Sequence, residues 1–159
     1  MNPILDLLKS NARLTADELA TLSGRHVDDV KRQLSEFEKD GTILAYRAVL
    51  NEDKLNGNKV RAAIELKITP ERGGGFDRLA ARIANYDEVI SCYLMSGGYD
   101  LLAIVEGESL QDVAGFVSEK LSTTQGILST ATHFILKTYK EQGLALESAT
   151  VDSRLPVAP

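Results

Sequence analysis

The chain has 159 residues and a net charge of −5 at pH 7, and 43% of its residues are hydrophobic against 26% charged. This composition suits one ordinary globular domain or two small ones and excludes an intrinsically disordered chain. The single cysteine excludes an internal disulfide framework, and the negative charge means that any nucleic-acid binding needs a local basic patch.

The amino-terminal segment MNPILDLLKSNAR lacks the basic leader and long apolar core of a signal peptide. No uninterrupted apolar run approaches the roughly 18 residues that a membrane-spanning helix needs. We therefore expect a cytoplasmic protein that does not bind a membrane.

The first forty residues predict three short helices. The first begins at Ile4, where an apolar face starts, and stops at Ser10-Asn11. Thr15 and Glu18 have the spacing of a capping box, in which each side chain bonds the other residue's amide, so the second helix begins there. Gly24 is expected to end it.

The third helix is expected from about Val27 to Asp40, because its apolar residues recur at steps of three and four. Gly41 follows as a stop, since the residue after a helix often takes a left-handed conformation that favours glycine. Two helices separated by a few residues around Gly24 predict a helix-turn-helix. A generic helical bundle is the alternative that the periodicity leaves open.

After Gly41 the periodicity changes from helical to strand-like. Residues 42–50, TILAYRAVL, predict a connecting strand, and residues 51–58, NEDKLNGN, predict a polar linker. Residues 59–69, KVRAAIELKIT, alternate apolar and polar side chains, which is typical of a half-buried strand.

The remaining elements complete a strand-helix-strand-strand-helix-strand order. We expect a helix from Phe76 to about Asn85, strands at 89–95 and 101–107, a helix across 110–121 and a last strand at 127–139. This order is the ferredoxin-like arrangement, an antiparallel sheet with two helices on one face.

The expected fold class is therefore α+β. A helix-turn-helix, winged-helix-like domain at residues 1–41 is joined by a strand and linker at 42–58 to a ferredoxin-like βαββαβ domain at 59–142. A carboxy-terminal tail follows at 143–159.

Four stretches, in this order, resemble the Lrp/AsnC family, the feast/famine regulators of bacteria and archaea. They are ILDLLKSNARLTADELA, DGTILAYRAVL, SGGYDLLAIVEG and QGILSTATHFIL. The resemblance covers Ile4 to about Lys140 and implies a transcription regulator that binds double-stranded DNA. It also implies a homodimer formed through the carboxy-terminal domains, which often assembles into an octamer, and a small-molecule effector, commonly an amino acid, bound between those domains.

The resemblance places the DNA-reading helix directly after Arg25-His26. Cations and amides near the start of such a helix contact phosphates and base edges in the major groove. The candidate DNA-binding residues are Arg25, His26, Lys31, Arg32 and Gln33. Asp28 and Asp29 in the first turn suit the helix dipole, but they repel phosphates.

This half of the chain departs from the family pattern. Arg25-His26 replaces the usual leucine-serine pair, so the hydroxyl cap is missing, and Gln33 stands where an arginine is common. Residues 1–56 hold 8 Lys or Arg against 10 Asp or Glu, a net charge of −2, although DNA affinity depends largely on cations that displace counterions. A metabolite-sensing and oligomerisation module that has lost DNA binding is therefore the open alternative.

The resemblance also assigns an effector site to the loop SGGYD. Its candidate residues are Gly97, Gly98, Tyr99, Asp100, Ser129, Thr130 and Thr132. The glycines permit a positive φ and a close backbone approach, and Asp100 could pair with an amino group of the ligand. The alternative is a plain hairpin turn in which Asp100 bonds turn amides and the threonines are good strand formers.

No catalytic residue, metal site or cofactor is predicted. The only two histidines, His26 and His133, belong to different expected domains, and neither has a partner at ligand spacing. The triple glycine at 73–75 lacks the Gly-Lys-Ser/Thr of a phosphate-binding loop. The sirohaem decarboxylases share this two-domain architecture, but they need histidines around a tetrapyrrole, so an enzyme is the least favoured alternative.

Overall fold

The computed structural model describes residues 2–55, 59–70 and 75–146. The chain divides into two compact units between Leu50 and Asn51, where the predicted connecting strand meets the predicted linker. Residues 56–58 of that linker, Gly73 and Gly74 of the triple glycine, and all but the start of the predicted tail lie outside the described residues.

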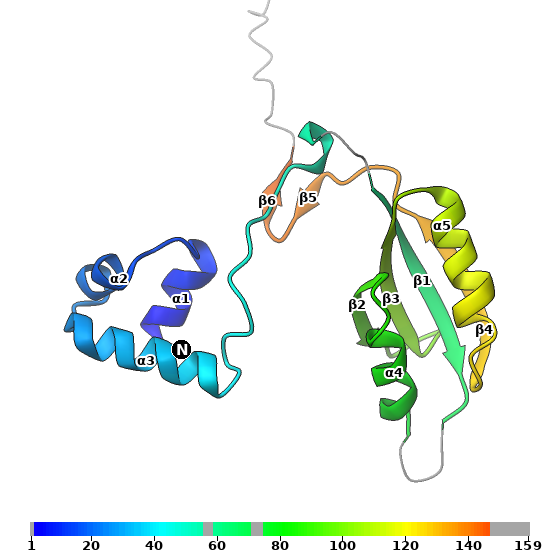
Figure 1. The fold of residues 1–159 in the computed structure, drawn as a ribbon, viewed down its shortest axis with the longest axis horizontal. Helices are drawn as coiled ribbons and strands as arrows, with labels where there is room; N and C mark the ends of the chain where they lie inside the picture. Colours follow the sequence, from blue (N-terminus) through cyan, green and yellow to red (C-terminus); the bar gives the residue numbers. More distant parts are fainter. Residues whose placement is uncertain (1, 56–58, 71–74, 147–159) are drawn as a thin grey trace, which may run out of the picture. The chain divides into compact units, whose positions relative to one another are not determined.

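The amino-terminal unit contains the three predicted helices, α1 (Pro3–Ser10), α2 (Ala16–Ser23) and α3 (Val27–Lys39) (Figure 1). The predicted capping box is present: the Glu18 amide donates to Thr15 Oγ1 at 3.3 Å and the Thr15 amide to Glu18 Oε2 at 2.7 Å. The helices enclose a small apolar core of Ile4, Leu19, Ala20 and Val30. This core joins the three helices into one packed unit.

The turn between α2 and α3 has three residues, as a helix-turn-helix requires. Gly24 ends α2 in a left-handed conformation, with φ +66°. His26 replaces the missing hydroxyl cap of α3, because its Nδ1 accepts a long hydrogen bond from the Asp28 amide at 3.4 Å. An imidazole nitrogen therefore occupies the place of the expected serine oxygen.

The predicted connecting strand at 42–50 is wrong. After α3, the Ile43 amide donates to the Phe37 carbonyl at 2.8 Å, and Gly41 has φ +77°, so the helix ends in a tight turn. Residues 44–50 then have no strand hydrogen bonds in the described chain, and Leu44 is 91% exposed. A strand needs a paired backbone, and no described segment supplies one here.

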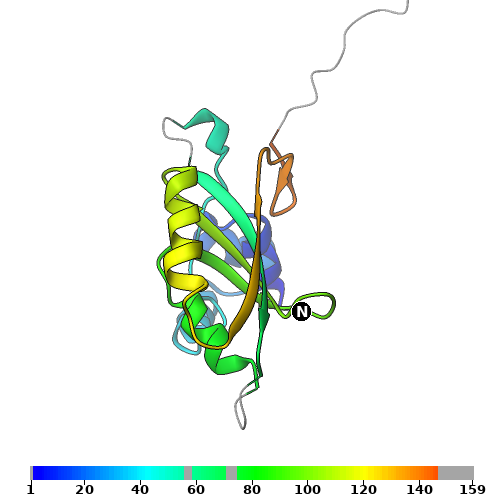
Figure 2. The ribbon, with the colours of Figure 1, turned by 90° about the vertical axis from the view of Figure 1, so that its right-hand side faces the viewer.

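The carboxy-terminal unit has the predicted strand and helix order. Its elements are β1 (Val60–Ile68), α4 (Asp77–Ala84), β2 (Val89–Leu94), β3 (Leu101–Gly107), α5 (Leu110–Gly115) with its π-helical continuation η2 (Phe116–Leu121), and β4 (Ile127–Phe134). The four strands form an antiparallel sheet in the order β2-β3-β1-β4. Figure 2 shows both helices on one face of this sheet. The ferredoxin-like fold is confirmed.

Alternating side chains of β1 and β3 bury one face of the sheet against the helices. The core contains Ala62, Ile64, Leu66 and Ile68 from β1, with Leu101, Ala103, Val105, Leu79, Ile83, Val113, Phe116 and Leu121. The intervening residues of β1, including Glu65 and Lys67, therefore lie on the open face of the sheet.

The last strand is shorter than predicted and ends at Phe134 instead of Tyr139. The Ile135 amide still donates to the Arg61 carbonyl at 2.9 Å, but β1 begins at Val60 and offers no further partner. Beyond this point the chain leaves the sheet and forms a short hairpin of β5 (Lys140–Glu141) and β6 (Leu144–Ala145).

Both edge strands contain a one-residue skip in register. On β2, Val89 opposes Val105 while Ser91 opposes Ile104, so Ile90 is unpaired. On β4, the skip leaves Leu128 without a partner, and its side chain is 69% exposed. Such bulges are common on edge strands, where they bend the strand and interrupt the ladder.

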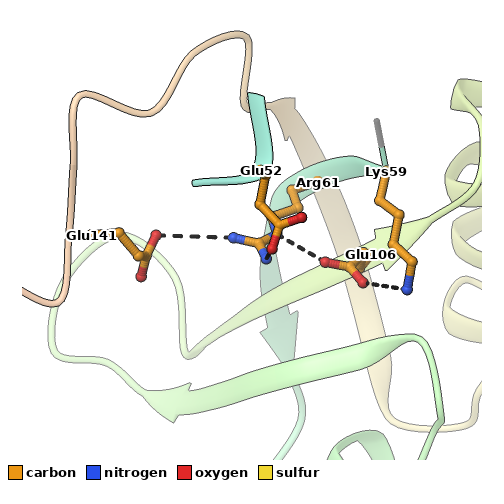
Figure 3. Close-up of polar contacts among 5 residues, drawn as sticks. All are labelled: Glu52, Lys59, Arg61, Glu106 and Glu141. Atoms are coloured by element: carbon orange, nitrogen blue, oxygen red, sulfur yellow. Dashed lines mark hydrogen bonds and ion pairs between the residues drawn. The ribbon is translucent and has the colours of Figure 1, made fainter. Parts of the chain in front are cut away.

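Arg61 connects the sheet with the hairpin and with a short 3-10 helix, η1 (Glu52–Lys54) (Figure 3). Its guanidinium lies 2.9 Å from Glu106, 3.7 Å from Glu52 and 3.9 Å from Glu141. Burial raises the pKa of Glu106, but hydrogen bonds from Lys59 and Arg61 outweigh this and leave its pKa below the ordinary value. One cation thus holds three segments that are distant in sequence.

Candidate functional site

The carboxy-terminal unit has a hollow on its open sheet face, beside the β2–β3 loop. Its volume is about 340 Å³, and its lining residues are Glu65, Lys67, Gly98, Tyr99, Ser129, Thr130 and Ala131. The volume is near the lower end for small-molecule pockets, which suits a metabolite better than a large cofactor.

The register between β1 and β4 places four of the residues that line the hollow on the same open face of the sheet. Lys67 lies opposite Ser129 and Glu65 lies opposite Ala131, so all four residues alternate with the buried ones. Small side chains on β4 leave room above the sheet, and Gly98 and Tyr99 of the loop form the other wall.

Asp100 is held by the fold and does not line the hollow. Its Oδ2 accepts a hydrogen bond from the Ile68 amide at 2.8 Å, and its own amide donates to the Leu66 carbonyl at 2.9 Å. The Met95 amide also donates to the Asp100 carbonyl at 2.8 Å. Asp100 therefore fixes the loop to the end of β1 and thereby positions Gly98 and Tyr99.

Four of the seven predicted effector residues line the hollow, namely Gly98, Tyr99, Ser129 and Thr130, and of these Thr130 opposes the buried Leu66, so its side chain is directed to the core face. Gly97, with φ +149°, shapes the turn. Thr132 opposes Ile64 on β1, so its side chain is directed to the core face. Neither these two residues nor Asp100 is part of the lining.

Glu65, Lys67 and Ala131 also line the hollow, although they were not among the predicted effector residues. The signal was present, because alternation along KVRAAIELKIT already placed Glu65 and Lys67 on the polar face. Only the pairing of β1 with β4 and the position of the loop showed which polar residues face the hollow.

In the amino-terminal unit, four of the five predicted DNA-binding residues are exposed: Arg25, His26, Lys31 and Arg32. Gln33 is half-buried on another side of α3, where its Oε1 accepts from Asn2 Nδ2 at 3.3 Å. The same Asn2 caps α1, because its Oδ1 accepts from the Ile4 amide. Gln33 thus connects α3 to the start of α1.

The exposed cations of α3 differ in how freely they can meet a phosphate. Arg32 Nη2 lies 2.6 Å from Asp29 Oδ1, so the Arg32 guanidinium already forms an ion pair with a carboxylate of the same helix. Among the described residues, no carboxylate forms an ion pair with Arg25 or Lys31. The surface is therefore less basic than its count of cations suggests.

Other site types find no support within residues 2–55, 59–70 and 75–146. That part of the chain has no cluster of three or more His, Cys, Asp or Glu side chains placed to hold a metal ion. None of its helices combines the length and the apolar composition required to span a bilayer.

Residues 61–145 match the model of the Lrp/AsnC ligand binding domain. Over 157 residues the chain is 45% identical to the HTH-type transcriptional regulator YugG of Bacillus subtilis (strain 168), an alignment that covers 98% of this chain and 95% of that protein. It is 28% identical to the proline dehydrogenase transcriptional activator of Rhodobacter capsulatus, over 87% of this chain and 90% of the relative.

Solved structures show the same architecture. A transcriptional regulator of Neisseria meningitidis in complex with L-methionine has a TM-score of 0.69 and 27% identity, with 91% of this chain and 93% of that chain covered. The leucine response regulatory protein of Mycobacterium tuberculosis has a TM-score of 0.74 and 22% identity, over 91% and 96% of the two chains, a likeness of fold alone.

Proposed function

The chain belongs to the Lrp/AsnC family of transcription regulators, and from that premise we propose that it binds DNA through α3 and responds to an amino acid bound in the hollow. The hollow is the observation that carries the proposal. It opens beside the glycine loop of the domain that matches the family's ligand-binding model, and its lining combines one acid, one base and hydroxyl groups. The methionine complex of the Neisseria relative supports an amino acid as the ligand class.

Arg25, His26 and Lys31 are the proposed DNA contacts. They lie at the start of α3 or in the turn before it, the part of a helix-turn-helix that enters the major groove. Their side chains are exposed, which such a contact needs. Gln33 is a structural residue in this proposal, because Asn2 already holds it.

Assembly through the carboxy-terminal units is part of the proposal. The open sheet face leaves Tyr93 in water, and Leu44 and Tyr46 at the end of the amino-terminal unit are exposed as well. A homodimer would cover such surfaces and place two α3 helices on one duplex, adding their phosphate contacts and so raising affinity.

The rival function is a sensing module whose helical unit does not bind DNA. The pairing of Asp29 with Arg32 favours it, together with the exposed Asp28, since both carboxylates lie where phosphates would approach. Under this reading the amino acid site is retained and the helix-turn-helix serves another contact.

Selection of DNA by the full-length protein separates the two functions. The protein is incubated with fragmented genomic DNA at low salt, and retained fragments are sequenced with and without a mixture of the twenty L-amino acids. We expect reproducible enrichment of a few loci, altered by the mixture. Enrichment no greater than that of a Lys31→Glu, Arg25→Glu variant would contradict DNA binding and favour the sensing module.

A further inference from the structure

The hollow presents two opposite charges from a single strand. Glu65 and Lys67 are two residues apart on β1 and both line it, so their backbones are separated by about 7 Å. The rest of the lining is uncharged, being Gly98, Tyr99, Ser129, Thr130 and Ala131. A ligand in the hollow therefore meets one negative and one positive group and no net charge.

Both charges are available to a ligand. Among the described residues, no carboxylate lies within ion-pairing distance of Lys67, whose side chain is exposed. Glu65 has one partner, since its Oε1 lies 3.3 Å from His133 Nε2, and its other oxygen is uncommitted. A carboxylate can accept several hydrogen bonds, so Glu65 can bind a second donor without releasing His133.

The loop itself cannot supply the negative group. Asp100 is the only carboxylate of SGGYD, and it is bonded to the Ile68 amide outside the hollow. This bond holds Asp100 at the end of β1, and Asp100 is not part of the lining, so a ligand in the hollow meets Glu65 as the one carboxylate among the lining residues. Glu65 is therefore the carboxylate that a ligand ammonium in the hollow can reach.

We propose that Glu65 and Lys67 recognise the two charged groups of a free α-amino acid, Glu65 binding the ammonium and Lys67 the carboxylate. This inference rests on the proposed effector function of the hollow and adds how the ligand is read. The ammonium and carboxylate of an α-amino acid are bonded to the same carbon, and Glu65 and Lys67 line the hollow from neighbouring positions on one face of β1, which suits a ligand with two charges close together. Gly98 and Tyr99 then border the ligand's side chain.

This arrangement selects zwitterions. A carboxamide analogue keeps the ammonium but gives Lys67 no anion, and a 2-hydroxy acid keeps the carboxylate but gives Glu65 no cation. Each analogue leaves one charge of the protein without its partner, so each loses a charge-assisted hydrogen bond. The loss corresponds to a tenfold or greater fall in affinity.

The test uses the full-length protein and calorimetric titration. The twenty L-amino acids are screened first, and the tightest is then compared with its carboxamide and its 2-hydroxy acid. We expect both analogues to bind at least about tenfold more weakly to the unaltered protein. Lys67→Met should bind the acid and the carboxamide with similar affinity, and Glu65→Gln should no longer distinguish the amino acid from the 2-hydroxy acid.

Glu108→Gln, an exposed carboxylate outside the hollow, is the matched control and should keep both preferences. Thermal unfolding checks that every variant is folded. If an amino acid binds and both variants keep the full discrimination against both analogues, the roles of Glu65 and Lys67 are overturned while the effector function stands. If none of the twenty amino acids binds the unaltered protein, the effector function fails, and this inference fails with it.

Discussion

The Asp100 carboxylate accepts a hydrogen bond from the backbone amide of Ile68 at 2.8 Å, which fastens the β2–β3 loop to the end of β1. The bond lies next to the bulge on β4, where the register between β1 and β4 shifts between Lys67 and Ile68. Asp100 thus satisfies a donor at an irregular point of the sheet and positions one wall of the hollow.

Removing this acceptor should destabilise the carboxy-terminal unit. Ile68 is 3% exposed, so Asp100→Ala leaves its amide poorly satisfied, and we expect a loss of about 1–3 kcal/mol in the free energy of unfolding. Urea denaturation measures it, with Glu108→Ala as an exposed control that should change stability by less than about 0.5 kcal/mol. An unchanged midpoint for Asp100→Ala would show that the bond contributes nothing net.

Two glycines of the same unit should respond to alanine in opposite directions. Gly126 has φ +97°, and a Cβ there would lie 3.0 Å from Leu79 Cδ2, so Gly126→Ala should destabilise by about 1–3 kcal/mol. Gly115 lies in α5 with open space around it, so Gly115→Ala should stabilise by about 0.5–1 kcal/mol. Thermal unfolding of the pair measures both signs, and a loss at both positions would contradict the helical placement of Gly115.

Arg61 should control whether the carboxy-terminal hairpin is docked. Arg61→Met removes one of the two cations that pair with Glu106 and leaves only Lys59. We expect the free energy of unfolding to fall by about 1–2 kcal/mol, which is less than for a fully buried ion pair because water screens the cluster. Hydrogen exchange at the Leu146 amide, which donates to the Tyr139 carbonyl within the hairpin, measures how well the hairpin stays closed when its ion pair with Arg61 is removed. Exchange as slow as in the unaltered protein would mean that Arg61 is dispensable.

The same cluster predicts a dependence on pH. The pKa of Glu106 is lower in the folded protein than the ordinary value, so the folded state binds its proton less readily than the unfolded state. The stabilisation is therefore complete above the unfolded carboxyl pKa and is lost as the pH falls through the folded one. Unfolding midpoints measured over a series of pH values should fall less steeply at acid pH for Glu106→Gln than for the unaltered protein. An equally steep fall in the two proteins would rule out a contribution from Glu106.

The capping box should decide the stability of α2. Thr15→Ala removes the acceptor of the Glu18 amide and should cost the amino-terminal unit about 1 kcal/mol. The Thr15 amide, which donates to the Glu18 carboxylate, holds the pKa of Glu18 below its ordinary value. The stabilisation that this hydrogen bond gives to α2 is therefore lost as the pH falls through the folded-state pKa of Glu18. Circular dichroism of Thr15→Ala and Thr15→Ser tests this, because serine keeps the cap and should stay close to the unaltered protein.

Freeing Arg32 should strengthen DNA binding. Asp29→Ala removes the partner at 2.6 Å, and one more phosphate contact should steepen the slope of log affinity against log salt by about 0.9. Fluorescence anisotropy with a selected fragment measures the slope. Arg32→Ala should then cost more affinity in the Asp29→Ala background than in the unaltered protein, and equal costs would show that Asp29 does not restrain Arg32.

Local signals were sufficient for most elements. The capping box at Thr15 and Glu18, the stop at Gly24 and the alternation along β1 each depend on neighbouring residues, and the structure confirms them. The order of elements then restricted the carboxy-terminal unit to a ferredoxin-like sheet. The strand at 42–50 failed because β-formers predict an extended chain, whereas a strand needs a partner, and none of the residues that the structure describes pairs with this segment.

The sequence by itself determined the family, the two-part organisation and the loop beside which the hollow opens, because motifs and periodicity are properties of adjacent residues. The tertiary structure decided which side chains share the hollow. Pairing of β1 with β4 brought Glu65 and Lys67 beside Ser129, and a slip of one residue would have turned them to the other face. It also committed Asp100 to Ile68 and Gln33 to Asn2, since contacts between distant segments are set by register and packing.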